Sequence, residues 1–202
     1  MSRRRWKSPG LKMTGQLRAN WIREIQSHAG WAISLLVLAF GAGTLVLALA
    51  AAWAGVRFND SRSMPPGFYV RVSSESRSSL AVFCPADPFA RLSVERGYRS
   101  RGNCPDGGEP LAKPIAARVG DTVELSATGM AVNGRLLPNT APLVSDTAGR
   151  PLSHWPFGRY VVAPGTVWVA SSYSRRSFDS RYFGPVEASQ VREHVRPLLT
   201  SR

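Results

Sequence analysis

The sequence predicts a mostly β protein, in which an antiparallel β domain follows a single N-terminal transmembrane helix. The first observation is an apolar segment, residues 31–56, that has no charged residue and is long enough to cross a bilayer. The second is the rest of the chain, where short apolar runs alternate with turns rich in glycine and proline. We therefore divide the chain into a basic arm (1–30), a membrane helix (31–56) and an exterior domain (57–202).

The basic arm sets the expected orientation in the membrane. The chain carries a formal net charge of +13, and Glu24 is the only acid among the first thirty residues. The bases there are Arg3, Arg4, Arg5, Lys7, Lys12, Arg18 and Arg23. A positive flank places the N-terminus in the cytoplasm, so we expect a single-pass protein of the inner membrane with a periplasmic domain. The expected partner of the arm is membrane lipid. The chain has no zinc-finger, basic-zipper or RRM signature, which disfavours nucleic acid, although an arm that also touches nucleic acid stays open.

The alternative for the apolar segment is a cleavable signal peptide, because small residues from Ala48 to Ala54 have cleavage-like spacing. However, the segment exceeds the roughly 7–15 residues of a signal h-region and follows a long charged arm. Trp31 and Trp53 lie near its two ends, where interfacial indoles are usually found. We favour a retained helix.

Short runs of β-branched and aromatic residues predict the strands of the exterior domain. The expected strands are 68–72, 81–83, 114–118, 122–125, 159–162 and 166–169. Asn133-Gly134 suits a type I′ turn, so residues 130–137 are predicted to form a hairpin. We also expect a polar loop at 73–79 and an insertion at 85–109. Many short strands separated by turns favour an antiparallel barrel or coiled sheets.

Cys84 and Cys104 are the only cysteines, and both lie in the domain assigned to the exterior. Two cysteines in an oxidising compartment indicate one disulfide, which would enclose the insertion; two unrelated buried thiols are the alternative. The three histidines are far apart in the sequence, and no Cys-x-x-Cys or His-x-x-x-His pair is present. We expect neither a metal nor another cofactor.

A serine-rich turn, Ser61-Arg62-Ser63-Met64-Pro65, follows the membrane segment closely and could hold a hydroxyl nucleophile beside the bilayer. A lone serine in such a loop is by default a turn residue, and a serine nucleophile needs a base. The candidates are a carboxylate, a histidine (His154 or His194) or Lys113, which precedes the expected strand 114–118. Partial burial would lower the pKa of Lys113 and make its neutral amine accessible, whereas a solvated lysine at a strand edge is the ordinary alternative.

The order of several motifs resembles the type I signal peptidase family. These motifs are Ser61-x-Ser63-Met64-Pro65, Lys113 before an apolar strand and Gly120-Asp121, Val132-Asn133-Gly134, and Ser177-Phe178-Asp179-Ser180-Arg181-Tyr182-Phe183-Gly184. The Pro-Pro-Gly-Phe-Tyr continuation, the Phe-Cys-Pro element and the cysteine-containing insertion are most similar to the TraF-type peptidases of conjugative transfer systems. One departure is Ser171-Ser172-Tyr173, which stands where general signal peptidases carry Gly-Asp-Asn.

The resemblance implies a signal-peptidase-like β domain and a role for six of the matching residues. Ser63 is the expected nucleophile and Lys113 the general base. Ser61 is expected beside the oxyanion hole, where the Ser63 backbone N–H is the other donor. Ser177 is expected to orient the lysine amine. Asp179 and Arg181 are expected to pair beneath the site.

The function implied is that of a membrane-anchored Ser-Lys endopeptidase that matures exported pilin-like or conjugal-transfer precursors. The acyl-enzyme could be resolved by water or by an amine, and the second outcome includes head-to-tail cyclisation of the product; the sequence does not separate the two. One alternative is a non-catalytic bitopic subunit of a secretion or transfer assembly. Another is a Ser-His-Asp hydrolase that uses His154 or His194, which is disfavoured because neither lies in a recognisable motif.

Overall fold

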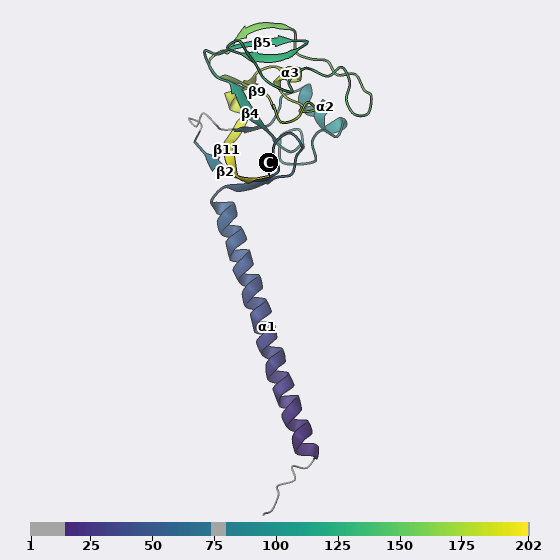
Figure 1. The fold of residues 1–202 in the computed structure, drawn as a ribbon, viewed down its shortest axis with the longest axis vertical. Coiled ribbons are helices and arrows are strands. Elements are labelled where there is room, and N and C mark those ends of the chain that lie inside the picture. The colour runs from purple at the N-terminus through teal and green to yellow at the C-terminus, as the bar shows by residue number, and fades with distance from the viewer. Residues whose placement is uncertain (1–14, 74–79, 202) are drawn as a thin grey trace, which may run out of the picture. The chain divides into compact units, whose positions relative to one another are not determined.

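The computed structural model describes residues 15–73 and 80–201, with side chains from residue 30 onward. Most of the predicted polar loop at 73–79 therefore lies outside the described residues. The chain forms two units, Met1–Ala51 and Ala52–Arg202, which we describe separately. Figure 1 shows the ribbon of both.

In the part of the N-terminal unit that the structure describes, the backbone forms one helix, α1 (Gly15–Trp53). Its apolar part, Gly30–Trp53, has 24 residues, a mean hydropathy of 2.4 and no buried residue. At 1.5 Å per residue this part measures about 36 Å, which is enough to cross a hydrocarbon core of about 30 Å.

The helix differs from the expectation at both ends. Helical backbone begins at Gly15, inside the segment assigned to the basic arm. The predicted end at Val56 is wrong, because the helix stops at Trp53 and Val56 begins the first strand. Gly55 explains the stop: its φ of +76° is a left-handed conformation that glycine adopts at no steric cost, and its N–H donates to the Ala52 carbonyl.

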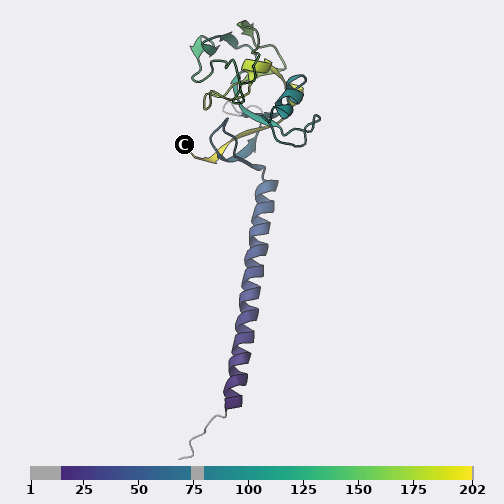
Figure 2. The ribbon, with the colours of Figure 1, turned by 90° about the vertical axis from the view of Figure 1, so that its right-hand side faces the viewer.

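The second unit is mostly β, as predicted, and its strands form two antiparallel sheets (Figures 1 and 2). The seven-stranded sheet has the order β1-β2-β11-β3-β4-β9-β10, and the four-stranded sheet has the order β7-β6-β5-β8. The larger sheet comprises β1 (Val56–Asn59), β2 (Gly67–Val72), β3 (Leu80–Phe83), β4 (Leu111–Ala117), β9 (Thr166–Val169), β10 (Val186–Glu187) and β11 (Val191–Thr200). The smaller sheet comprises β5 (Thr122–Ser126), β6 (Gly129–Val132), β7 (Arg135–Leu136) and β8 (Gly158–Val161).

The hairpin predicted at 130–137 is confirmed. β6 and β7 are antiparallel, with Val132 opposite Arg135. The two residues between them, Asn133 and Gly134, have φ of +50° and +81°. Positive φ at both central positions is the mark of a type I′ turn.

Strand β11 was not predicted, although it joins the two halves of the larger sheet. It pairs with β2 on one side and with β3 on the other. Only Val195 of its ten residues is buried, and the register shifts once against each neighbour. The segment therefore lacks the alternating apolar pattern by which a strand is recognised in a sequence.

Three short helices complete the domain: α2 (Phe89–Glu95), α3 (Ser180–Phe183) and a 3₁₀ turn, η1 (Ala188–Gln190). The core divides into three apolar clusters, one of which carries the serine-rich turn. In that cluster Met64 packs with Tyr69, Leu80 and Val195. The next residue after the proposed nucleophile is thus anchored in the core.

Candidate active site

The serine-rich turn is held from its C-terminal side. Met64 is 1% exposed, and the Tyr69 hydroxyl donates to the Pro65 carbonyl at 2.7 Å. Ser63 itself is half-buried, and both Ser61 and Ser63 line one groove of the domain. The turn therefore presents its serines from a fixed backbone instead of a free loop.

Asn59, at the end of β1, supports the same turn and was not identified from the sequence. Its Oδ1 accepts from the Ser61 hydroxyl at 2.8 Å, and its amide donates to the Pro65 carbonyl at 3.3 Å. The hydroxyl of Ser61, predicted to lie beside the oxyanion hole, is thus bonded to Asn59 in this state. Both contacts are local in the sequence, but asparagine is common at turns, so its presence there did not indicate a role in a site.

Lys113 occupies the interior of β4, not the position ahead of a strand that the sequence suggested. The strand begins earlier, at Leu111, because Lys113 pairs with Ala81 of β3 even though Pro114 follows. Only 3% of the lysine is exposed, yet it lines the same groove as Ser63. Burial lowers the pKa of Lys113 to about 8; the Asp179 charge opposes this shift and the Arg181 charge adds to it.

Asp179 and Arg181 form a fully buried ion pair, with both side chains 0% exposed. The Arg181 guanidinium meets both carboxylate oxygens, at 2.8 Å from Nε and 2.9 Å from Nη2. Asp179 also accepts from the backbone N–H groups of Arg181 and Ser171, and it caps the N-terminus of α3. The predicted pairing of Asp179 with Arg181 is therefore present in the structure.

Ser177 lies next to this pair and is 1% exposed. Its carbonyl accepts from Arg181 Nη2 at 2.8 Å. Its hydroxyl is buried and has no hydrogen-bond partner among the described residues. A buried hydroxyl without a partner is costly, so such a group is a candidate for a functional role. Its predicted role, orienting the amine of Lys113, stays a prediction.

Ser171 is a site residue that the sequence analysis noted only as a departure from the family pattern. It is 0% exposed, and its hydroxyl donates to the Ser63 carbonyl. Its backbone N–H donates to Asp179 at 3.1 Å. Ser171 thus links the proposed nucleophile to the buried ion pair, which only the fold could reveal.

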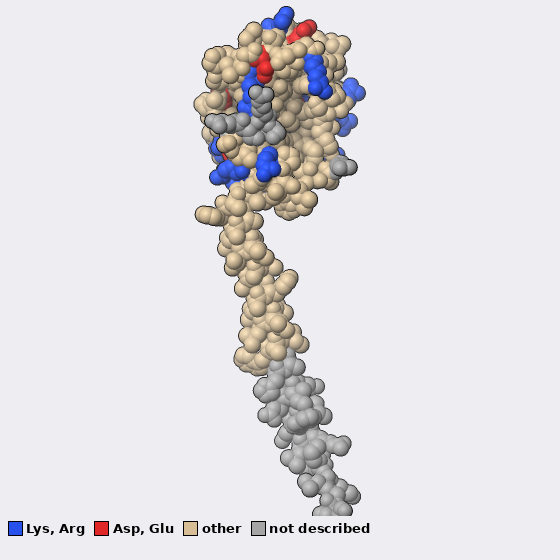
Figure 3. Space-filling view, turned by 60° about the vertical axis from the view of Figure 1, so that its left-hand side comes forward, with Lys and Arg blue, Asp and Glu red and all other residues tan. Residues whose placement is uncertain are grey.

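The groove has a volume of about 1470 Å³ and brings together Ser61, Ser63 and Lys113. Asp179 and Ser177 are buried behind it. Neither His154 nor His194 is among the described residues that line it. Figure 3 shows one face of the domain, where basic side chains outnumber acidic ones.

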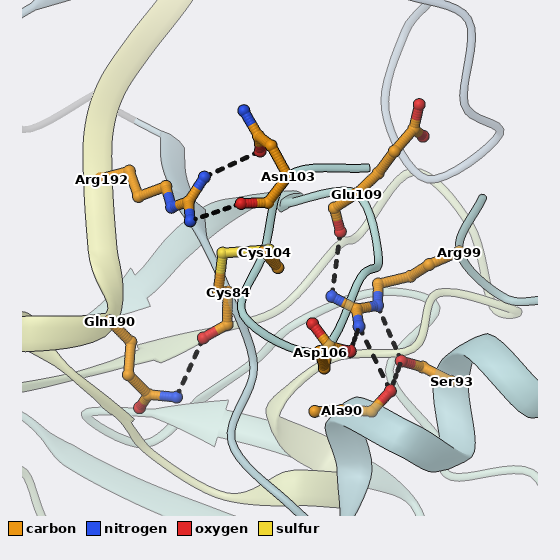
Figure 4. The surroundings of a disulfide bond; sticks show 10 residues. All are labelled: Cys84, Ala90, Ser93, Arg99, Asn103, Cys104, Asp106, Glu109, Gln190 and Arg192. Atoms are coloured by element: carbon orange, nitrogen blue, oxygen red, sulfur yellow. Dashed lines mark hydrogen bonds and ion pairs between the residues drawn. A yellow bond between two sulfur atoms is a disulfide. The ribbon is translucent and has the colours of Figure 1, made fainter. Parts of the chain in front are cut away.

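The predicted disulfide is present between Cys84 and Cys104 (Figure 4). Gln190 donates to the Cys84 carbonyl, and Arg192 donates twice to Asn103, which ties both ends of the insertion to the region around β11. The insertion begins more than 20 positions after Ser63 and ends four positions before Lys113, and part of it lines the groove. The lining residues from the insertion are Tyr98, Arg99, Ser100, Gly102, Asn103 and Glu109.

Comparisons with known proteins agree on one family. The sequence profile of the family described as "Signal peptidase, peptidase S26" matches residues 30–198. A "Plasmid transfer protein TraF" from Escherichia coli is 36% identical over 170 residues, which cover 81% of this chain and 93% of that protein. A "Conjugal transfer protein TraF" from Agrobacterium tumefaciens (strain 15955) is 36% identical over 173 residues, which cover 82% and 95%.

Among solved structures, the match with a signal peptidase I from Enterococcus faecalis V583 covers 60% of this chain and 97% of the chain in that structure. It is 21% identical with a TM-score of 0.34, which is too low to carry an argument about the fold. The matches of sequence decide the assignment. The chain belongs to the S26 signal peptidase family, and a role as a membrane-anchored serine peptidase follows from that membership.

Proposed function

We propose that this protein is a membrane-anchored endopeptidase in which Lys113 acts as general base for the nucleophile Ser63. The observation that carries this proposal is a lysine that is 3% exposed, has a pKa lowered to about 8, and lines the same groove as Ser63. A lysine with that pKa supplies a neutral amine at mildly alkaline pH, which is what proton abstraction from serine requires.

The reaction has an acylation half, described first, and a second half in which the ester on Ser63 is resolved. The Lys113 amine takes the Ser63 proton while Oγ attacks the scissile carbonyl, and the resulting oxyanion is held by the Ser63 N–H and the Ser61 hydroxyl. The Lys113 ammonium then gives its proton to the departing amine, which leaves an ester between Ser63 and the substrate. For Ser61 to serve as donor, its hydroxyl must turn from Asn59 toward the oxyanion.

We further propose that the substrate is an exported, pilin-like precursor of a conjugal transfer system. The support is that relatives similar over most of both chains are named as plasmid or conjugal transfer proteins. The ester on Ser63 has two fates. Attack by water gives a linear product, whereas attack by the N-terminal amine of the same substrate chain gives a head-to-tail ring.

The test is mass spectrometry of exported candidate subunits from cells that contain the wild-type protein or Ser63→Ala. We expect a shortened product with the wild type and the unprocessed precursor with Ser63→Ala. A product lighter than the linear fragment by one water identifies cyclisation. Equal processing by both proteins, with Ser63→Ala folded and in the membrane, would favour the non-catalytic bitopic subunit.

A further inference from the structure

Ser171 follows β9 closely and connects two parts of the molecule that are far apart in the sequence. Its hydroxyl donates to the carbonyl of Ser63, 108 positions away. Its N–H donates to Asp179 Oδ2 at 3.1 Å, and its Oγ accepts from the Tyr173 N–H at 3.1 Å. Ser171 is fully buried, and its backbone N–H, its hydroxyl proton and its Oγ lone pair each have a partner within the protein.

We propose that Ser171 is a positioning residue for the nucleophile, because it fixes the Ser63 carbonyl and thereby the direction of the Ser63 side chain. This inference rests on the proposed role of Ser63. The carbonyl orientation sets ψ of Ser63, while the buried Met64 side chain anchors the residue that follows. With the peptide plane after Ser63 held in this way, the Cα–Cβ bond of Ser63 has little freedom to change its direction in the groove that Ser63 shares with Lys113.

The rigidity comes from the ion pair beneath. Asp179 receives two bonds from the Arg181 guanidinium and is 0% exposed, so the carboxylate that accepts from Ser171 N–H cannot move easily. The chain of contacts therefore runs from Arg181 through Asp179 and Ser171 to Ser63. Asp179 acts on Lys113 through its charge and on Ser63 through Ser171.

Positioning of this kind affects rate far more than substrate affinity. A misplacement of about 1 Å in the reacting groups can cost about 10²-fold in rate. Ser171 is 0% exposed and is not among the described residues that line the groove. Its loss should therefore lower kcat and leave KM nearly unchanged.

The experiment uses the full-length protein in detergent and a quenched fluorescent peptide. The peptide is selected from a random library by mass spectrometry, as one that the wild type cleaves and Ser63→Ala does not. Ser171→Ala is compared with Ser180→Ala, a matched control. Ser180 is also 0% exposed, but its Oγ accepts from a different backbone group, Val169 N–H at 2.9 Å.

We expect Ser171→Ala to lower kcat about 10- to 100-fold with KM within about twofold. Ser180→Ala should keep kcat within about twofold at a similar fall in Tm. The acid limb of kcat/KM should keep its midpoint in Ser171→Ala, because the pKa of Lys113 depends on burial, Asp179 and Arg181. If Ser171→Ala does not fold, Ser171→Cys, close in size but a weak donor, carries the same expectations.

Three results would overturn the inference: wild-type kcat in Ser171→Ala, an equal loss of kcat in Ser180→Ala, or a rise in KM that accounts for the whole effect. The proposed function fails separately, if no library peptide is cleaved by the wild type and spared by Ser63→Ala. In that case Ser171 has no nucleophile to position, and the inference falls with it.

Discussion

Two buried Arg–Asp pairs lie in two different regions of the domain. One is Asp179–Arg181, beneath the candidate site, and the other is Arg99–Asp106, inside the disulfide-linked insertion (Figure 4). Both arginine side chains are at most 1% exposed. Both pairs join a guanidinium to a carboxylate, so differences between their effects come from the residues around them.

The two carboxylates differ in how completely they are satisfied. Asp179 is 0% exposed, and both of its oxygens accept hydrogen bonds from Arg181. The Asp106 side chain is 12% exposed, and its Oδ1 has no partner among the described residues. Both arginines have acceptors besides the carboxylate. Arg99 donates to Ser93, Glu109 and Ala90, and Arg181 donates to the carbonyls of Asn139, Ala141, Arg175 and Ser177.

The surroundings also decide what each pair acts on. The charges of Asp179 and Arg181 both shift the pKa of Lys113, and Asp179 holds Ser171 against Ser63. The contacts of Arg99 stay within the insertion, at Ser93, Asp106 and Glu109. We infer that the first pair governs reactivity and the second only the stability of the groove wall.

The largest effect should come from Lys113, the group on which the first pair acts. Lys113→Arg keeps the positive charge, but a guanidinium is not deprotonated in proteins and cannot serve as a base. We expect cleavage to fall by at least about 10²–10⁴, the usual contribution of a general base. In the wild type, kcat/KM should rise with pH through a midpoint near 8, as the Lys113 ammonium loses its proton.

Kinetics of purified Lys113→Arg, with circular dichroism to verify folding, provide the measurement. Lys113→Met, which is uncharged and similar in length, is the companion variant if the larger arginine disturbs the buried position. Near-normal turnover by either folded variant would remove the Ser-Lys dyad from consideration.

Asp179→Asn should have the next largest effect, because it breaks the pair that supports both Lys113 and Ser63. The amide keeps the shape but leaves Arg181 buried without a full counter-charge, which costs about 3–5 kcal/mol. The rate should fall about 10²-fold as the support of Ser63 loosens. The acid limb of the pH profile of kcat/KM should move to lower pH. The Asp179 carboxylate raises the pKa of Lys113, and without this charge the lowering effect of Arg181 is unopposed.

Asp106→Asn is the matched control and sharpens the comparison between the pairs. The Asp106 side chain is 12% exposed and only its Oδ2 is paired, so we expect a smaller loss, of about 1–3 kcal/mol, in the free energy of unfolding. The rate and the acid limb should be unchanged. If Asp179→Asn showed wild-type kinetics, or Asp106→Asn shifted the acid limb, the division between the two pairs would be wrong.

Removal of the disulfide also tests whether the insertion contributes to stability and not to the chemical step. Cys84 and Cys104 are 20 positions apart, and a loop of that length adds about 3 kcal/mol in the chain-entropy account. A double serine variant should melt earlier yet retain kcat at low temperature, since Gln190 and Arg192 still hold the ends of the insertion. Labelling of both thiols in the native wild-type protein would show that the bridge is not formed.

The sequence predicted features that local residue types specify, and it missed roles that are seen only when the partners in the fold are known. Glycine and asparagine at 133–134 predicted a hairpin because the turn needs positive φ, which is a local property. Ser171 could not be assigned because its partner Ser63 lies 108 positions away. Asn59 could not be assigned because asparagine is common at turns and has no distinguishing pattern there. β11 was missed for a related reason: it is specified by pairing with β2 and β3 and buries only Val195.

The smallest effects are expected at the two histidines outside the region 1–30, and they test the rival triad. His154 is exposed and stacks on Phe157, with ring centroids 3.9 Å apart. His194 is the sharper case, because burial, and secondarily Arg118, lower its pKa, so its neutral form is available as a base.

The sheet register also places His194 in one cross-strand row with Lys113. His194 lies opposite Ala81, and Ala81 lies opposite Lys113. Directly paired residues share a face of a sheet, so His194 is on the side of the proposed base, about 10 Å away at two strand spacings. Lys113 nevertheless lines the groove with Ser63, and His194 does not appear among its described lining residues.

We therefore expect His194→Ala and His154→Ala to keep cleavage of the same peptide within about twofold of wild type, since neither removes a group from the proposed reaction. A folded His194→Ala as inactive as Ser63→Ala would transfer the role of base from the lysine to the histidine two strands away.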